Sequence, residues 1–131
     1  MSIYTFAFDS AETPVHERLG GKCTSLAIMT AAGAPVPPGF AITTDAFDAV
    51  MNQTSLREHI LRVLDGLDLD DPAEVDRRAA HVRELIMTQE VPDTVRDDTI
   101  TAYDTLIKHC GGEVPVAVRS SATAEDLPDA S

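Results

Sequence analysis

The sequence predicts an α+β fold in which short strands near both ends of the chain flank a helical insert. Runs of β-branched and aromatic residues occur near both ends, whereas the middle repeats apolar residues with a helical period. The 131 residues, 44% of them hydrophobic and 24% charged, suit one globular domain or part of a larger one. We expect αβ segments at residues 1–52 and 112–131, with the insert at residues 53–111.

Two strands and two helices are predicted in the first αβ segment, at residues 3–8, 39–43, 23–32 and 46–51. Both strand segments are rich in β-branched and aromatic residues. The first helix ends at Gly33, because glycine readily adopts the left-handed conformation that commonly follows a helix. The second helix follows Thr44 and Asp45, which are suitable cap residues.

Three further helices are predicted in the insert, each with a start signal and an apolar stripe. Ser55 and Glu58 form a capping box before the first, Asp71 and Pro72 open the second, and the third begins near Pro92. Their inward faces are expected to be Leu56, Ile60, Val63, Leu64 and Leu67; Val75, Ala79, Val82, Leu85 and Ile86; and Val95, Thr99, Tyr103, Leu106 and Cys110.

Acidic residues are concentrated over residues 65–76, between two of these helices. They most simply solvate the connecting loop, and a cation site is the alternative. The spacing lacks the glycine and the closing glutamate of an EF-hand loop, which favours the first interpretation.

Charge and cysteine content exclude several classes of protein. The formal net charge of −12 repels phosphate backbones, so nucleic-acid binding is not expected. Cys23 and Cys110 lie far apart without a metal-binding pattern, which indicates reduced thiols in a cytoplasmic protein without zinc. The chain has no basic leader and no run of about 18 apolar residues, so we expect neither secretion nor membrane spanning.

The glycine turn Gly20-Gly21-Lys22 directly precedes the first predicted helix. A lysine opposes the helix dipole at that end, which suggests an anion bound by Lys22 and the free backbone N–H groups. The two glycines would let the backbone approach the anion closely. The alternative is an exposed lysine beside a flexible turn.

A last strand is predicted over residues 114–120, in the same β layer as the first two. It carries Arg119, whose guanidinium can bind two oxygens of an anion, with the hydroxyls of Ser120, Ser121 and Thr123 beside it. The alternative is a surface arginine followed by an ordinary loop. Two such sets of residues in an acidic chain favour a specific polyanionic ligand.

Three segments carry a family resemblance: residues 19–22 (LGGK), residues 35–40 (PVPPGF) and residues 117–131 (AVRSSATAEDLPDAS). They are similar to the N-terminal ATP-binding domain of the phosphoenolpyruvate synthase and pyruvate phosphate dikinase group, which rifampicin phosphotransferase shares. The resemblance extends over nearly the whole chain, and residues 117–131 are its most specific part.

The resemblance implies the first lobe of an ATP-grasp-type nucleotide-binding domain, in which Lys22 and Arg119 match the residues that contact ATP phosphates. The full set expected to bind ATP is Lys22, Arg119, Gly20, Gly21, Ser120, Ser121 and Thr123. No catalytic residue and no metal ligand is assigned within the chain.

In enzymes of this group, ATP phosphorylates a histidine on a separate swivelling domain, and AMP and phosphate are released. The histidine then passes its phosphoryl group to an acceptor such as pyruvate. The second ATP-grasp lobe, the phosphohistidine domain and the magnesium ligands are expected outside this chain, in cis or in trans. The four histidines lack the expected context and are interpreted as surface or helix-end residues: His16, His59, His81 and His109.

The alternative function is a stand-alone, non-catalytic domain. Its acidic helical face would then serve as a protein-interaction or regulatory module.

Overall fold

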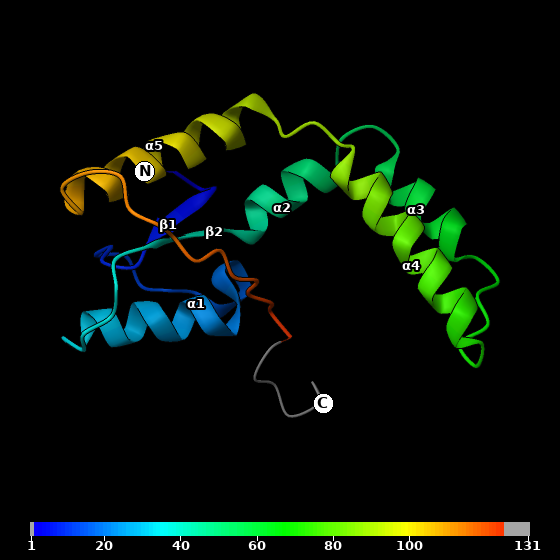
Figure 1. The fold of residues 1–131 in the computed structure, drawn as a ribbon, viewed down its shortest axis with the longest axis horizontal. Helices are drawn as coiled ribbons and strands as arrows, with labels where there is room; N and C mark the ends of the chain where they lie inside the picture. The colour runs from blue at the N-terminus through cyan, green and yellow to red at the C-terminus, as the bar shows by residue number, and fades with distance from the viewer. Residues whose placement is uncertain (1, 125–131) are drawn as a thin grey trace. The chain divides into compact units, whose positions relative to one another are not determined.

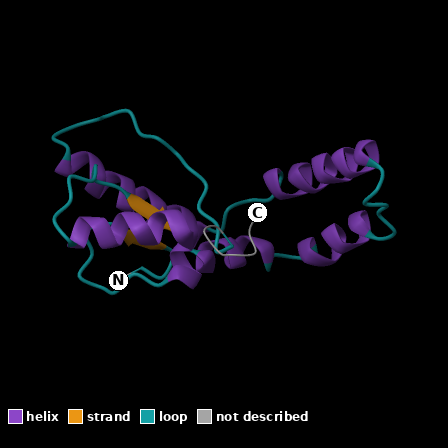
Figure 2. Cartoon of the chain, turned by 90° about the horizontal axis from the view of Figure 1, so that it is seen from below, coloured by secondary structure: helices purple, strands orange, loops and turns teal. Residues whose placement is uncertain are grey.

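A computed structural model of the protein describes residues 2–124, which divide into two compact units. The sheet unit comprises residues 2–47 and 93–124, and the hairpin unit comprises residues 48–92. The elements, labelled in Figure 1, are in chain order β1 (Thr5–Ala7), α1 (His16–Ala31), β2 (Phe40–Ile42), α2 (Thr44–Met51), α3 (Leu56–Leu64), α4 (Pro72–Met87) and α5 (Asp93–His109). Figure 2 distinguishes the helices from the strands by colour. The predicted α+β class is confirmed.

The first two predicted strands pair as the antiparallel sheet of the sheet unit. Phe6 of β1 lies opposite Ala41 of β2, and both side chains are buried. A backbone hydrogen bond from Phe8 N to Gly39 O, at 3.0 Å, continues the pairing past the end of β1. Each strand is only three residues long, so the sheet depends on the helices that cover it.

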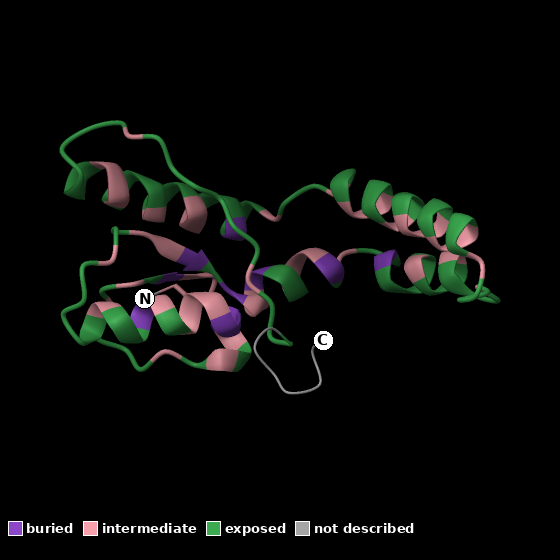
Figure 3. Ribbon diagram, turned by 60° about the horizontal axis from the view of Figure 1, so that its bottom comes forward, coloured by how far each residue is buried: buried purple, intermediate pink, exposed green. Residues whose placement is uncertain are grey.

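The sheet lies between two helices, as Figure 1 shows: α1 packs against β2, and α5 packs against both strands. The core of this unit consists of Phe6, Leu19, Ala27 and Ala41, with Phe8 and Cys23 packed against it. Figure 3 shows buried positions on the strands and on α1. This packing holds the N-terminal part of α1 in place beside the sheet.

The third predicted strand is not formed. Residues 114–118 have no strand partner among residues 2–124, and Val118 is 94% exposed. A strand forms only where a neighbour supplies backbone hydrogen bonds, so β-branched residues alone do not produce one. The prediction of a β layer from three segments was therefore wrong for residues 114–120.

The helix α5 belongs with the sheet, and not with the helical insert in which it was predicted. Its inward face includes Val95, Thr99 and Leu106, as predicted. Tyr103 and Cys110 are exposed, so the predicted stripe was wrong at these two positions. An apolar stripe defines a helix face but does not say which element covers it.

The hairpin unit consists of the end of α2 and the packed pair α3 and α4. The predicted cap of α4 is confirmed, because the Asp71 carboxylate accepts a hydrogen bond from Glu74 N. The capping box of α3 is not formed: Ser55 has ψ of 30° and makes no side-chain cap bond. An N-cap residue needs an extended backbone for its side chain to reach the helix N–H groups, and Ser55 lacks it.

No metal site accounts for the acidic loop. Within residues 2–124, no group of three or more His, Cys, Asp or Glu side chains is placed to hold a metal ion. Two of the carboxylates accept local backbone hydrogen bonds instead, with Asp68 bonded to Asp70 N and Asp71 bonded to Glu74 N.

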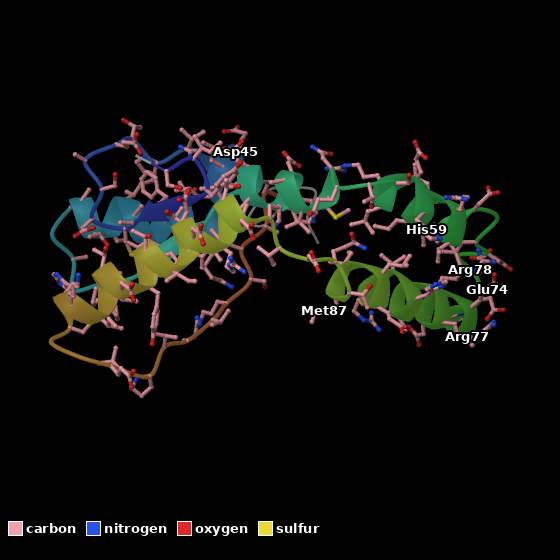
Figure 4. All side chains as sticks on the ribbon, turned by 90° about the horizontal axis from the view of Figure 1, so that it is seen from above. Asp45, His59, Glu74, Arg77, Arg78 and Met87 are labelled. Atoms are coloured by element: carbon pink, nitrogen blue, oxygen red, sulfur yellow. The ribbon has the colours of Figure 1, made fainter. Side chains whose placement is uncertain are left out.

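Arg78 ties α4 to the end of α3. Its guanidinium donates to Val63 O at 2.8 Å and to Asp65 O at 2.7 Å, and it pairs with Glu74. Figure 4 shows Arg78 beside Glu74, whereas Arg77 is exposed on the same helix. The two carbonyls belong to the last turn of α3 and the residue after it, where a cation is favourable.

We expect Arg78→Met to destabilise the hairpin unit by roughly 1–3 kcal/mol, because it removes charge-assisted hydrogen bonds while retaining apolar bulk. Hydrogen exchange resolved by segment should show faster exchange in α3 and α4. Arg77→Met is the matched control and should change the opening free energy obtained from hydrogen exchange by less than about 0.5 kcal/mol. Equal effects of the two substitutions would contradict the role of Arg78.

Candidate functional site

The candidate site begins with a break in α1 at the predicted glycine turn. Gly20 has φ of 76° and ψ of 170°, which are not helical values, so the helix restarts at Gly21. Glycine tolerates this backbone conformation because it has no Cβ. Lys22 therefore stands at the beginning of a helical segment, as predicted, although four further helical residues, His16 to Leu19, precede the break.

Residues 120–123 lie against this break. Gly21 N donates to Ala122 O at 3.1 Å, and Lys22 Nζ donates to Ser120 O at 3.0 Å. Figure 1 shows this C-terminal segment, in orange, passing the N-terminal part of α1. These contacts bring the glycine turn and the segment after Arg119 together, as expected if Lys22 and Arg119 bind the same ligand, although the segment is not a strand.

Gly20 is required by this contact between two parts of the chain. A Cβ at Gly20 would lie 2.5 Å from Ser121 Oγ and 2.9 Å from both N and O of Ala122. These distances are shorter than any van der Waals contact, so only glycine fits. The glycines were expected to allow the close approach of an anion, but in the structure Gly20 allows the close approach of residues 121–122.

The backbone N–H groups of the restarted helix are also occupied within the chain. Gly21 N bonds to Ala122 O, and Cys23 N bonds to Ser121 Oγ at 3.3 Å. The expectation that these two N–H groups are free for an anion was therefore wrong. The structure satisfies orphan donors at a helix start with a nearby segment, as buried helix ends require.

Two residues with cationic side chains nevertheless belong to the segments that meet at this site. Lys22 Nζ donates to the carbonyl of Ser120. Arg119 directly precedes Ser120, so the Cα atoms of these two residues are about 3.8 Å apart. Arg119 is exposed, and no residue within 2–124 pairs with its guanidinium. Together they provide positive charge in a chain of net charge −12.

His16 contacts the site, although the sequence pattern did not predict this. Its Nε2 lies 2.6 Å from Thr123 O, so the first residue of α1 also contacts the C-terminal segment. Its position at a helix end agrees with the prediction. The contact joins residues 107 positions apart, and no local sequence signal indicates it.

A cavity of about 720 Å³ lies elsewhere in the sheet unit, beside β1 and α5. Its lining includes Phe8 and Phe40 together with the carboxylates of Asp9, Glu12 and Asp98. Three carboxylates oppose the binding of a phosphate chain. The end that bears Lys22 and Arg119 is therefore the better candidate for an anionic ligand.

Comparison with known proteins identifies the family. The sequence profile described as "Pyruvate phosphate dikinase, AMP/ATP-binding domain" matches residues 16–131, which include the Gly20 break and the segment that contacts it. The chain belongs to this family. It is thus an AMP/ATP-binding domain of the phosphoenolpyruvate synthase and pyruvate phosphate dikinase type.

Curated relatives agree with this assignment. The chain is 42% identical over 113 residues to a probable phosphoenolpyruvate synthase of Methanothermobacter thermautotrophicus, covering 86% of this chain and 16% of the relative. A probable phosphoenolpyruvate synthase of Methanocaldococcus jannaschii is 47% identical over 113 residues, covering 86% of this chain and 10% of the relative. The phosphoenolpyruvate synthase of Neisseria meningitidis is 39% identical over 133 residues, covering 98% of this chain and 17% of the relative.

The chain spans about a sixth or less of the length of these relatives. Residues 125–131, part of the most specific motif of the resemblance, lie outside the described residues. Among the described residues, no helix is long and apolar enough to span a membrane.

Proposed function

We propose that the chain is the nucleotide-binding lobe of a phosphoenolpyruvate synthase-like phosphotransferase, built on an ATP-grasp-type fold. The observation that carries the proposal is the direct contact between the Gly20–Lys22 turn and residues 120–123, which brings the two predicted anion-binding segments together. Family membership supports ATP as the ligand. The comparisons do not favour the alternative of a non-catalytic interaction module.

Lys22 and Arg119 are the residues assigned to the phosphate chain of ATP. Phosphoryl transfer requires mainly positioning and neutralisation of charge, and an ammonium and a guanidinium supply the latter. The exposed hydroxyls of Ser120 and Thr123 are available to donate further hydrogen bonds. The role that we assign to Gly20 and Gly21 is to form the turn that holds Lys22.

The complete reaction requires parts that this chain does not supply. In the proposal, ATP phosphorylates a histidine on a swivelling domain, AMP and phosphate leave, and the histidine phosphorylates an acceptor such as pyruvate. The second lobe, the histidine domain and the magnesium ligands act in cis or in trans. Within the chain, His59 and His81 are exposed on helices, and neither has the sequence context of a phosphorylated histidine.

Titration of the isotopically labelled chain with ATP, followed by amide NMR, tests the proposal and detects even weak binding. We expect shift changes at residues 20–23 and 119–123, and no response of these residues to pyruvate. Shift changes confined to the cavity beside β1 and α5, or none up to millimolar ATP, would contradict the assignment.

The 131-residue chain by itself is expected to have no turnover, because it contains neither the second lobe nor a phosphohistidine candidate. The measurement is AMP release from ATP in the presence of pyruvate and magnesium. Production of AMP and phosphoenolpyruvate by the purified chain would refute the division of labour proposed above.

A further inference from the structure

The break in α1 interrupts the helical hydrogen bonds that span Gly20, and one of them is the bond between Cys23 N and Leu19 O. In an unbroken α-helix, the N–H of residue 23 donates to the carbonyl of residue 19, four positions earlier. The backbone of Gly20, with φ of 76° and ψ of 170°, interrupts this ladder. Leu19 O and Cys23 N therefore need other partners.

The Ser121 hydroxyl supplies both partners at once. Its Oγ donates to Leu19 O at 2.8 Å and accepts from Cys23 N at 3.3 Å. A hydroxyl is suited to this position because it is a donor and an acceptor on a single atom. Insertion of a side chain into the helix ladder is a known cause of a helix break, and here the side chain comes from about a hundred positions away.

The inserted hydroxyl lies at a site where unpaired polar groups are costly. Leu19 is 3% exposed, and Gly20 and Gly21 are also buried. Without the hydroxyl, the carbonyl and the N–H would both lose a hydrogen bond in a poorly solvated place. The alternatives are a strained break or a straightened helix.

We propose that Ser121 is a positioning residue for Lys22, because its hydroxyl replaces the helical hydrogen bond between Cys23 N and Leu19 O. Lys22 lies between the two backbone groups that Ser121 bridges, so the bridge sets the direction in which the lysine leaves the helix. The adjacent bond from Gly21 N to Ala122 O and the contact of Lys22 Nζ with Ser120 O complete the same junction. The consequence for ATP rests on the proposed function.

This role differs from the direct phosphate contact predicted for Ser121. A serine hydroxyl has one proton, and in the structure that proton is donated to Leu19 O. Ser121 thus supports the residue that meets the ligand, while Ser120 and Thr123 keep exposed side chains.

Amide hydrogen exchange of Cys23 in the 131-residue chain tests the bridge directly. We expect protection of this amide in the unsubstituted protein, because it donates to Ser121 Oγ. Ser121→Ala should raise its exchange rate roughly tenfold or more, which corresponds to the loss of a hydrogen bond. Ser121→Thr, which keeps the hydroxyl, should retain the protection, and Ser25→Ala on the exposed side of α1 is the matched control.

The ATP titration of the same variants tests positioning. Ser121→Ala should weaken binding severalfold, and Ser121→Thr should restore it. Weaker Cys23 protection with unchanged ATP affinity in Ser121→Ala would overturn the positioning of Lys22 by Ser121. An unprotected Cys23 amide in the unsubstituted chain would by itself overturn the hydrogen-bonded bridge through Ser121. If the unsubstituted chain bound no ATP, the proposed function and the role towards Lys22 would fail, while the exchange data would still decide the bridge.

Discussion

Lys22→Ala and Arg119→Ala are each expected to weaken ATP binding about ten- to a hundredfold. Each substitution removes a charge-assisted contact to phosphate, which is worth about 1.5–3 kcal/mol. In a complete enzyme built on this lobe, the loss in kcat/KM should be larger still if the contact strengthens in the transition state. The measurement is the dissociation constant from the ATP titration of the chain, compared with the steady-state kinetics of the complete enzyme.

The chain offers close controls for these substitutions. Lys108 is the only other lysine in the sequence and lies in the last turn of α5, so Lys108→Ala removes the same charge elsewhere. Arg77→Ala does the same for an exposed arginine of α4. Neither control should change ATP affinity by more than about twofold, which corresponds to less than 0.5 kcal/mol. Full affinity in both the Lys22 and Arg119 variants would require the nucleotide-site assignment to be abandoned.

Gly20→Ala is expected to have the largest effect on stability, roughly 3 kcal/mol or more. The backbone conformation at Gly20, with φ of 76° and ψ of 170°, is one that essentially only glycine adopts. In addition, the new methyl group would lie 2.5 Å from Ser121 Oγ and 2.9 Å from the backbone of Ala122. Urea denaturation of the chain measures the change in the free energy of unfolding, and hydrogen exchange in α1 shows whether the change is located at the break.

Gly33→Ala provides a reference for a glycine with a positive φ and no close neighbour. Gly33 also has a positive φ, 84°, but a Cβ there meets no atom within 4 Å. Its substitution should therefore cost only the backbone term, about 1–2 kcal/mol. A cost at Gly20 no greater than that at Gly33 would show that residues 121–122 do not pack against the break in solution.

Local signals in the sequence predicted most of the helices correctly. Asp71 followed by Pro72 opens α4. The helix predicted over residues 23–32 corresponds to the later part of α1, which ends at Ala31, two residues before Gly33. Such signals depend on hydrogen bonds between residues a few positions apart, so the sequence contains them directly. The capping box at Ser55 failed because the conformation of the residue, and not its identity alone, determines whether its side chain reaches the helix.

The two segments of the candidate site could also be predicted from the sequence, because glycine, lysine and arginine at those spacings suggest anion binding. Only the tertiary structure decided how the segments meet: Gly20 admits residues 121–122, and the Ser121 hydroxyl replaces the bond between Cys23 and Leu19. It likewise decided that α5 covers the sheet and that residues 114–118 form no strand. These outcomes depend on which distant groups satisfy the buried backbone N–H and C=O groups, and that depends on the path of the whole chain.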